Sequence, residues 1–97
     1  VIGIGGIALK AAFVMQTLSN VLSMPIKVCN TDQACALGAA MFAATAAGAY
    51  ATVAEAQDAM NSGFAKEYFP EPDQVKIYDE VYQRYLKLGA YCEEVAK

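Results

Sequence analysis

Apolar and polar positions follow two different periods along the N-terminal part of the chain. A short apolar run, Val1–Ile4, ends in a double glycine and predicts a strand followed by a tight turn. From about Lys10 to Ser23, apolar residues return every three or four positions, which predicts a helix with one buried face. Met24-Pro25 ends this helix, and residues 26–29 alternate as a second short strand. We therefore expect a strand, turn, helix and strand in that order.

The middle of the chain predicts two helices. The polar turn Asn30-Thr31-Asp32, with Asp32 as the expected N-cap, precedes a helix from about Gln33 to Ala47. The small residues of this helix would let it approach a sheet or another helix closely, and Gly48 is the expected C′ residue.

A shorter helix is expected from Val53 to about Asn61. Thr52 is its expected N-cap and Glu55 completes a capping box, while Gly63 follows its end. These residue types satisfy the free backbone groups at helix ends, so both boundaries are well marked.

The C-terminal third predicts an extended segment and then a long helix. Residues Phe64–Pro72 carry two prolines and are expected to form an extended surface arm. A last helix is expected from Asp73 to about Val95, with tyrosines at helical spacing that predict a packing face: Tyr78, Tyr82 and Tyr85.

Length and composition predict a single partial domain over residues 1–97, of which residues 64–97 form the arm and the C-terminal helix. Ninety-seven residues bury only a modest core, and 57% of them are hydrophobic against 18% charged. That balance suits a segment that packs against more protein, and Val1 already lies in an apparent strand. We expect a piece of a longer chain that self-associates through open sheet edges when alone.

Charge and cysteine content exclude several classes of function. A net charge of −3 without histidine argues against binding to nucleic acid or to acidic membranes. The residues of Ala34–Ala51 are too weakly hydrophobic for a membrane span, and no signal peptide is visible, so a cytoplasmic protein is expected. The cysteines lack the spacing of a zinc site and are expected to be buried or half-buried thiols: Cys29, Cys35 and Cys92.

The glycine turn is the main candidate for chemistry. A strand, a glycine-rich turn and a helix N-terminus together favour phosphate or nucleotide binding. Gly3-x-Gly5-x-x-Ala8 fits the dinucleotide fingerprint, with Asp32 near the position of a ribose-binding acid, so an NAD-binding module is one hypothesis. Two points argue against this hypothesis. A dinucleotide-binding helix usually begins at the second glycine, whereas the helix here is expected to begin at Lys10, and Asp32 is explained more simply as an N-cap. A structural or interaction domain with the tyrosine helix as its contact face is another hypothesis.

A resemblance points to a third class. Four segments, in this order and spacing, resemble the C-terminal ATPase lobe of the FGGY carbohydrate kinases: Gly5-Gly6-Ile7-Ala8, Phe13-Val14-Met15-Gln16, Met24-Pro25-Ile26-Lys27-Val28 and Ala36-Leu37-Gly38-Ala39-Ala40-Met41. The continuation through Tyr68-Phe69-Pro70 and Ile77-Tyr78-Asp79-Glu80 is similar to the bacterial ribulokinase branch of that family. The resemblance covers essentially the whole chain. It implies an α/β fold, a helix-rich piece of an actin-like (ribonuclease H-like) lobe with a few short strands.

The resemblance also implies a function for the intact protein. It implies a cytoplasmic homo-oligomer that transfers phosphate from ATP, with Mg²⁺, to the ketopentose L-ribulose in arabinose catabolism. Gly5 and Gly6 would lie against the adenosine, Lys10 near the base and Gln16 toward the cleft. The phosphate loops and the catalytic aspartate of such kinases lie upstream of the segment that matches, so the chain alone is expected to be inactive.

Three positions depart from the pattern of the ribulokinase branch. Leu9 stands where a basic residue is common, Ala11 where a serine is usual and Asn20 where an aspartate is usual. These departures are expected to affect nucleotide contacts or a capping interaction.

Overall fold

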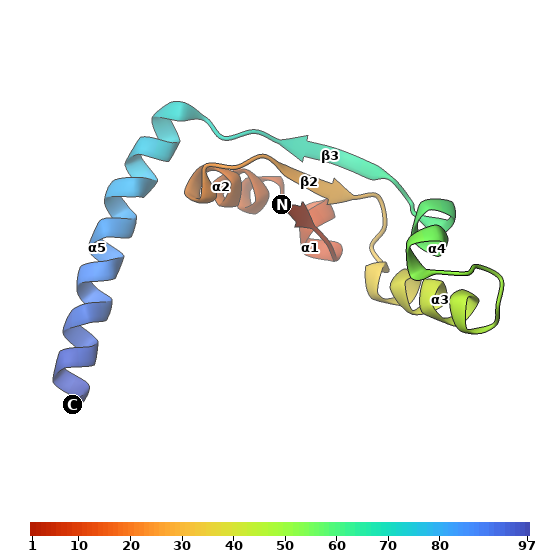
Figure 1. The fold of residues 1–97 in the computed structure, drawn as a ribbon. Coiled ribbons are helices and arrows are strands. Elements are labelled where there is room, and N and C mark those ends of the chain that lie inside the picture. Colours follow the sequence, from red (N-terminus) through yellow and green to blue (C-terminus); the bar gives the residue numbers. More distant parts are fainter.

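A computed structural model describes all of residues 1–97 as a small sheet with helices at both ends (Figure 1). In chain order the elements are β1 (Ile2–Gly3), α1 (Gly6–Lys10), α2 (Ala12–Leu22), β2 (Ile26–Cys29), α3 (Ala34–Ala46), α4 (Val53–Met60), β3 (Phe64–Tyr68) and α5 (Pro72–Ala96). The molecule extends over 54 × 36 × 20 Å because α5 and the α3–α4 pair lie at opposite ends (Figure 1).

The three strands form one sheet in the order β1-β2-β3. β1 runs parallel to β2, with Ile2 opposite Lys27, which confirms the expected strand, helix and strand unit. β3 runs antiparallel to β2, with Ile26 opposite Tyr68. The segment 64–72, expected to be a surface arm, is extended, but its first five residues belong to the sheet.

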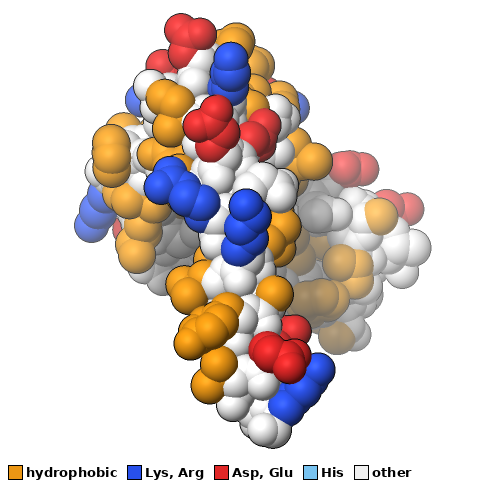
Figure 2. Space-filling view, turned by 90° about the vertical axis from the view of Figure 1, so that its left-hand side faces the viewer, with side chains coloured by type: hydrophobic (Ala, Val, Ile, Leu, Met, Phe, Trp, Pro, Cys, Tyr) orange, Lys and Arg blue, Asp and Glu red, His pale blue; other side chains and the backbone are white.

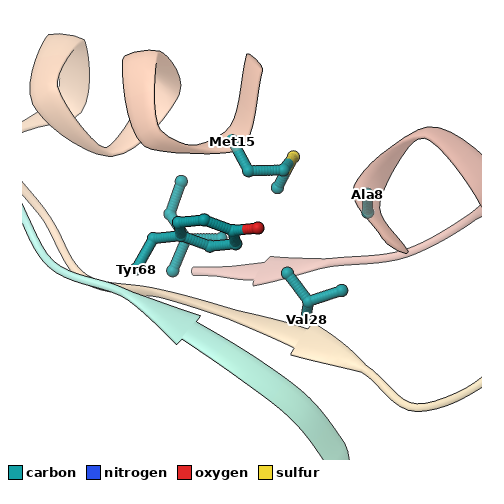
Figure 3. Close-up of a cluster of buried hydrophobic side chains, with 5 residues drawn as sticks. Ala8, Met15, Val28 and Tyr68 are labelled. Carbon is teal, nitrogen blue, oxygen red and sulfur yellow. The ribbon is translucent and has the colours of Figure 1, made fainter. Parts of the chain in front are cut away.

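One face of the sheet carries the core, shown in Figure 3. α1 and α2 place Ala8 and Met15 against the inward side chains of β2 and β3, and the buried cluster consists of Ala8, Met15, Ile26, Val28 and Tyr68. Gly3 allows the close approach, because a Cβ atom there would lie 2.7 Å from Cε of Met15. Met15 is thus a core side chain.

The expected helix from Lys10 to Ser23 is two helices in the structure. α1 begins at Gly6, so the expectation that the helix starts at Lys10 was wrong. Ala11 leaves the helical conformation at φ −106° and ψ 76°, and α2 starts at the next residue. No glycine or proline marks this break, and the residues on both sides of it are good helix formers. The local sequence therefore gives no sign of it. Ser23, in the left-handed conformation, ends α2.

The boundaries of α3 and α4 agree with their capping residues, with one exception. Gly48 has φ +82° and follows α3, and Oγ1 of Thr52 accepts a hydrogen bond from the Glu55 amide at 3.2 Å at the start of α4. The exception is Asp32, because the N-cap of α3 is Gln33 without a side-chain cap. Thr31 instead binds the local backbone, its Oγ1 accepting from the Gln33 amide at 3.1 Å.

α5 projects away from the sheet with no buried residue along its length (Figure 1). The expectation that its tyrosine face packs is therefore wrong in part within this chain: Tyr78 is half-buried, but Tyr82 and Tyr85 stack on each other and remain exposed. The expectation for the cysteines was also wrong in part. Cys29 is half-buried, but Cys35 on α3 and Cys92 on α5 are exposed, because each lies on a side of its helix that no other element covers.

We predict that Gly3→Val destabilises the chain by about 1–3 kcal/mol, because the larger side chain must displace Met15 from a packed core. Urea unfolding followed by circular dichroism measures the change. Ala90→Leu, which adds bulk on exposed helix surface and keeps a good helix former, is the control and should change the stability by less than about 0.5 kcal/mol. Equal stability of Gly3→Val and the original chain would show that Met15 does not need this glycine.

Candidate nucleotide-binding turn

The turn between β1 and α1 exposes backbone on one side. Gly5 is the N-cap of α1 with φ +92°, a conformation that side chains with a Cβ rarely adopt. A Cβ built at Gly5 or at Gly6 meets no atom within 4 Å, so both glycines face open space. The first amides of a helix have no partner within that helix. A flat group therefore has access to the backbone here.

Lys10 lies on the same helix face as Gly6, four residues further along α1. Its side chain is exposed, and as the basic residue of the last turn it also interacts favourably with the helix dipole. A group lying over Gly6 is within reach of a lysine side chain at this spacing. Gly5, Gly6 and Lys10 thus share one short element.

Gln16 lies on α2, where its side-chain amide is already bonded. Nε2 of Gln16 donates to the Phe69 carbonyl oxygen at 2.8 Å and to Oδ1 of Asn20 at 3.2 Å. These bonds connect α2 to the segment that leads from β3 into α5. The structure therefore does not bring the Gln16 amide to the glycine turn.

Asn20 is the centre of this connection and is 4% exposed. Its Oδ1 accepts from the Glu71 amide at 2.8 Å, and its Nδ2 donates to Oε1 of Glu71 at 3.5 Å. Ser19 is also buried, its Oγ donating to the Met24 carbonyl oxygen at 2.7 Å. The adjacent polar pair Ser19-Asn20 among the apolar positions of α2 is the sequence signal of this network.

An open groove of about 480 Å³ lies at the carboxyl ends of β1 and β2, next to the glycine turn. In open sheets of parallel strands, ligands bind outside this edge. α3 and α4 form the opposite wall, and the side chains that line the groove include Ile4, Cys29, Thr31, Leu37, Met41, Asp58, Asn61 and Phe64.

No three histidine, cysteine, aspartate or glutamate side chains converge in the structure. None of the helices has the length and hydropathy that a membrane-spanning helix needs.

Sequence comparison places the glycine turn within a segment that matches a known protein family. The model of the C-terminal domain of the FGGY family of carbohydrate kinases matches residues 1–47, which hold the glycine turn and β2. A ribulokinase of Vibrio parahaemolyticus is 44% identical over all 97 residues, and one of Bacillus licheniformis is 42% identical over 91 residues. The chain therefore matches the C-terminal segment of the FGGY carbohydrate kinases. It spans 17% and 16% of the lengths of these two relatives.

Solved structures with the same arrangement are sugar kinases as well. A ligand-bound xylulose kinase from Lactobacillus acidophilus superposes with a TM-score of 0.76 and 28% identity over 90% of this chain and 17% of its own. A gluconate kinase from the same organism gives 0.71 and 28% over 82% of this chain and 16% of its own. The expected fold class is thereby confirmed, an α/β piece of the actin-like ATPase fold.

We predict that Asn20→Ala releases the start of α5 from α2. The Glu71 amide loses its buried acceptor, which costs about 1–3 kcal/mol, so its hydrogen exchange should become at least about tenfold faster. Hydrogen exchange followed by mass spectrometry reads this amide directly. Asn30→Ala, at an exposed asparagine before α3, is the matched control and should leave the rate unchanged. Unchanged exchange at Glu71 in Asn20→Ala would contradict the network.

Proposed function

We propose that the chain is the C-terminal nucleotide-binding part of an ATP-dependent sugar kinase. The observation that carries the proposal is the open turn at Gly5 and Gly6, which lies within the segment that matches the FGGY family. Glycine lets the backbone lie flat against a purine, because no Cβ separates the two. In this proposal the turn forms one wall of the adenine pocket and the remainder of the kinase forms the other.

The two polar candidates have different support. Lys10 shares a helix face with Gly6, which supports a contact with the edge of the base. Gln16 would have to give up its bonds to Phe69 and Asn20 to reach a nucleotide, so we place it second.

We propose L-ribulose as the sugar and arabinose catabolism as the setting, because the relatives with the highest identity described above are ribulokinases. Mg²⁺ and the catalytic base would come from other parts of the intact kinase, since phosphoryl transfer needs both against the γ-phosphate. The chain by itself is proposed to be inactive. The intact protein is proposed to be a cytoplasmic homo-oligomer.

The topology of the sheet supports a kinase lobe over an NAD-binding module. A doubly wound dinucleotide fold continues its sheet with parallel strands, whereas β3 is antiparallel to β2. Asp32, the proposed ribose ligand in that alternative, is exposed and is not among the residues that line the groove.

A chimeric kinase tests the nucleotide site. This chain would replace the matching segment of the Vibrio parahaemolyticus ribulokinase, and phosphorylation of L-ribulose would be measured with varied ATP or varied sugar. Gly6→Val should raise the KM for ATP at least about tenfold and leave the KM for L-ribulose unchanged, because the side chain fills the space above the turn without touching the chain itself.

Ala90→Val serves as the control, because it adds bulk on the exposed part of α5, which projects away from the sheet and its glycine turn (Figure 1). An unchanged KM for ATP in Gly6→Val, or a rise for the sugar alone, would refute the assignment of the turn. Titration of the chimera with NAD separates the alternative, which requires NAD to bind in preference to ATP.

A further inference from the structure

The chain exposes far more surface than a compact protein of its size. Its accessible surface is 6949 Å², whereas a folded monomer of 10.3 kDa has about 5,400 Å². The radius of gyration is 18.6 Å against about 12.5 Å for a compact chain of this length. The excess area is about twice the 800 Å² or so that one partner buries in a standard interface.

α3 is apolar on every side. Its thirteen residues include no charged side chain, and none of the thirteen is buried. A helix that is hydrophobic all round is stable when it is enclosed by protein. In this chain α4 is the only element that packs extensively against it.

α5 carries hydrophobic side chains around more than half of its circumference, with Arg84 and Glu93 among them. At 100° per residue, its hydrophobic side chains cover an arc of about 220°, wider than the stripe of a helix that packs on one layer. Figure 2 shows them along the helix beside a row of charged side chains. The exposed members are Ile77, Val81, Tyr82, Tyr85, Leu86, Leu88, Tyr91 and Val95.

The sheet has one uncovered face. α1 and α2 cover the side of Gly3, Ile26 and Val28, while the alternate residues Ile2 and Ile4 of the opposite side are 58% and 57% exposed. The groove of about 480 Å³ lies on this bare side and leads to Leu37 and Met41 of α3.

We propose that α3, α5 and the bare sheet face form one composite docking surface for the remaining part of an FGGY kinase chain. This proposal rests on the function proposed above and names the partner that completes the same lobe. Residues 1–97 would bind that part tightly even when the two are separate polypeptides, because the surface is as large as an obligate interface.

A second copy of the chain does not fit this surface as well. α3 and α5 lie at opposite ends of a molecule 54 Å long (Figure 1), and one isologous interface uses one contiguous patch on each copy. The solved neighbours keep the same arrangement inside chains of which this segment is 17% and 16%. A much larger polypeptide reaches both ends at once.

The exposed cysteines provide the test, because Cys35 lies on α3 and Cys92 within the apolar arc of α5. The chain would be co-expressed with a tagged Vibrio parahaemolyticus ribulokinase that lacks the matching segment. We expect a one-to-one complex by native mass spectrometry, without nucleotide, and at least about tenfold slower maleimide labelling of both cysteines than in the chain alone. Leu88→Asp should abolish the complex, and Gln83→Asp, on the polar side of α5, should not.

As a positive control, the matching segment of the Vibrio parahaemolyticus ribulokinase is co-expressed with the same truncated kinase. If the truncated kinase binds that segment but does not bind this chain, the proposal is overturned. If the truncated kinase binds neither segment, maleimide labelling of the covalent chimera decides. Slow labelling of Cys35 and Cys92 supports the docking surface, and labelling as fast as in the chain alone overturns it. None of these readouts involves ATP. A failure of the nucleotide site therefore remains distinguishable from a failure of the docking surface.

Discussion

The close approach of the backbone at Gly3 to Met15 is the constraint on which the rest of the structure depends. A side chain at this position would meet Cε of Met15 at 2.7 Å and push α2 away from the sheet. Since α1 and α2 supply the only helical cover of β1 and β2, their contact with the sheet defines the single core. That core also determines where β1 ends, and hence where the turn at Gly5 and Gly6 points.

A second set of contacts connects the distant C-terminal part to this core. Tyr68 enters the buried cluster from β3, and Asn20 receives the Glu71 amide just before α5 begins. These contacts and the packing against α2 hold the start of α5 as far as Tyr78, but residues 79–96 of the helix are all exposed. The structure thus has one packed core at the sheet, while the helices at its two ends, α3 and α5, bury no residue within the chain. Such a form suits a segment of a larger lobe better than a free domain.

Local signals in the sequence predicted most of the elements but not their tertiary contacts. β2, α3, α4 and α5 lie within a residue or so of their expected positions, because alternation, glycine and the Thr52 cap are local features. The break at Ala11 and the pairing of β3 with β2 depend on contacts across the sheet, so periodicity did not indicate them. Asp32 shows the same limit, since the polar turn was recognised but the N-cap was misplaced by one residue.

The candidate site was predictable only in part for a similar reason. The conformation of Gly5 and the open space over Gly6 follow from a glycine pair before a helix. The position of Gln16 does not follow from its sequence neighbours, because its partners are the Phe69 carbonyl and Asn20. The polar side chains of α2 hold the C-terminal segment, while the turn faces outward toward the proposed nucleotide.

The most direct measurement is photolabelling of the chimeric kinase with 8-azido-ATP, followed by mass spectrometry of the labelled peptides. The account predicts that the label on this chain is found on the peptide that contains Gly5, Gly6 and Lys10, and that excess ATP prevents it. Label confined to α3, α4 and α5, or absent from residues 1–97, would contradict the assignment of the turn as a wall of the adenine pocket.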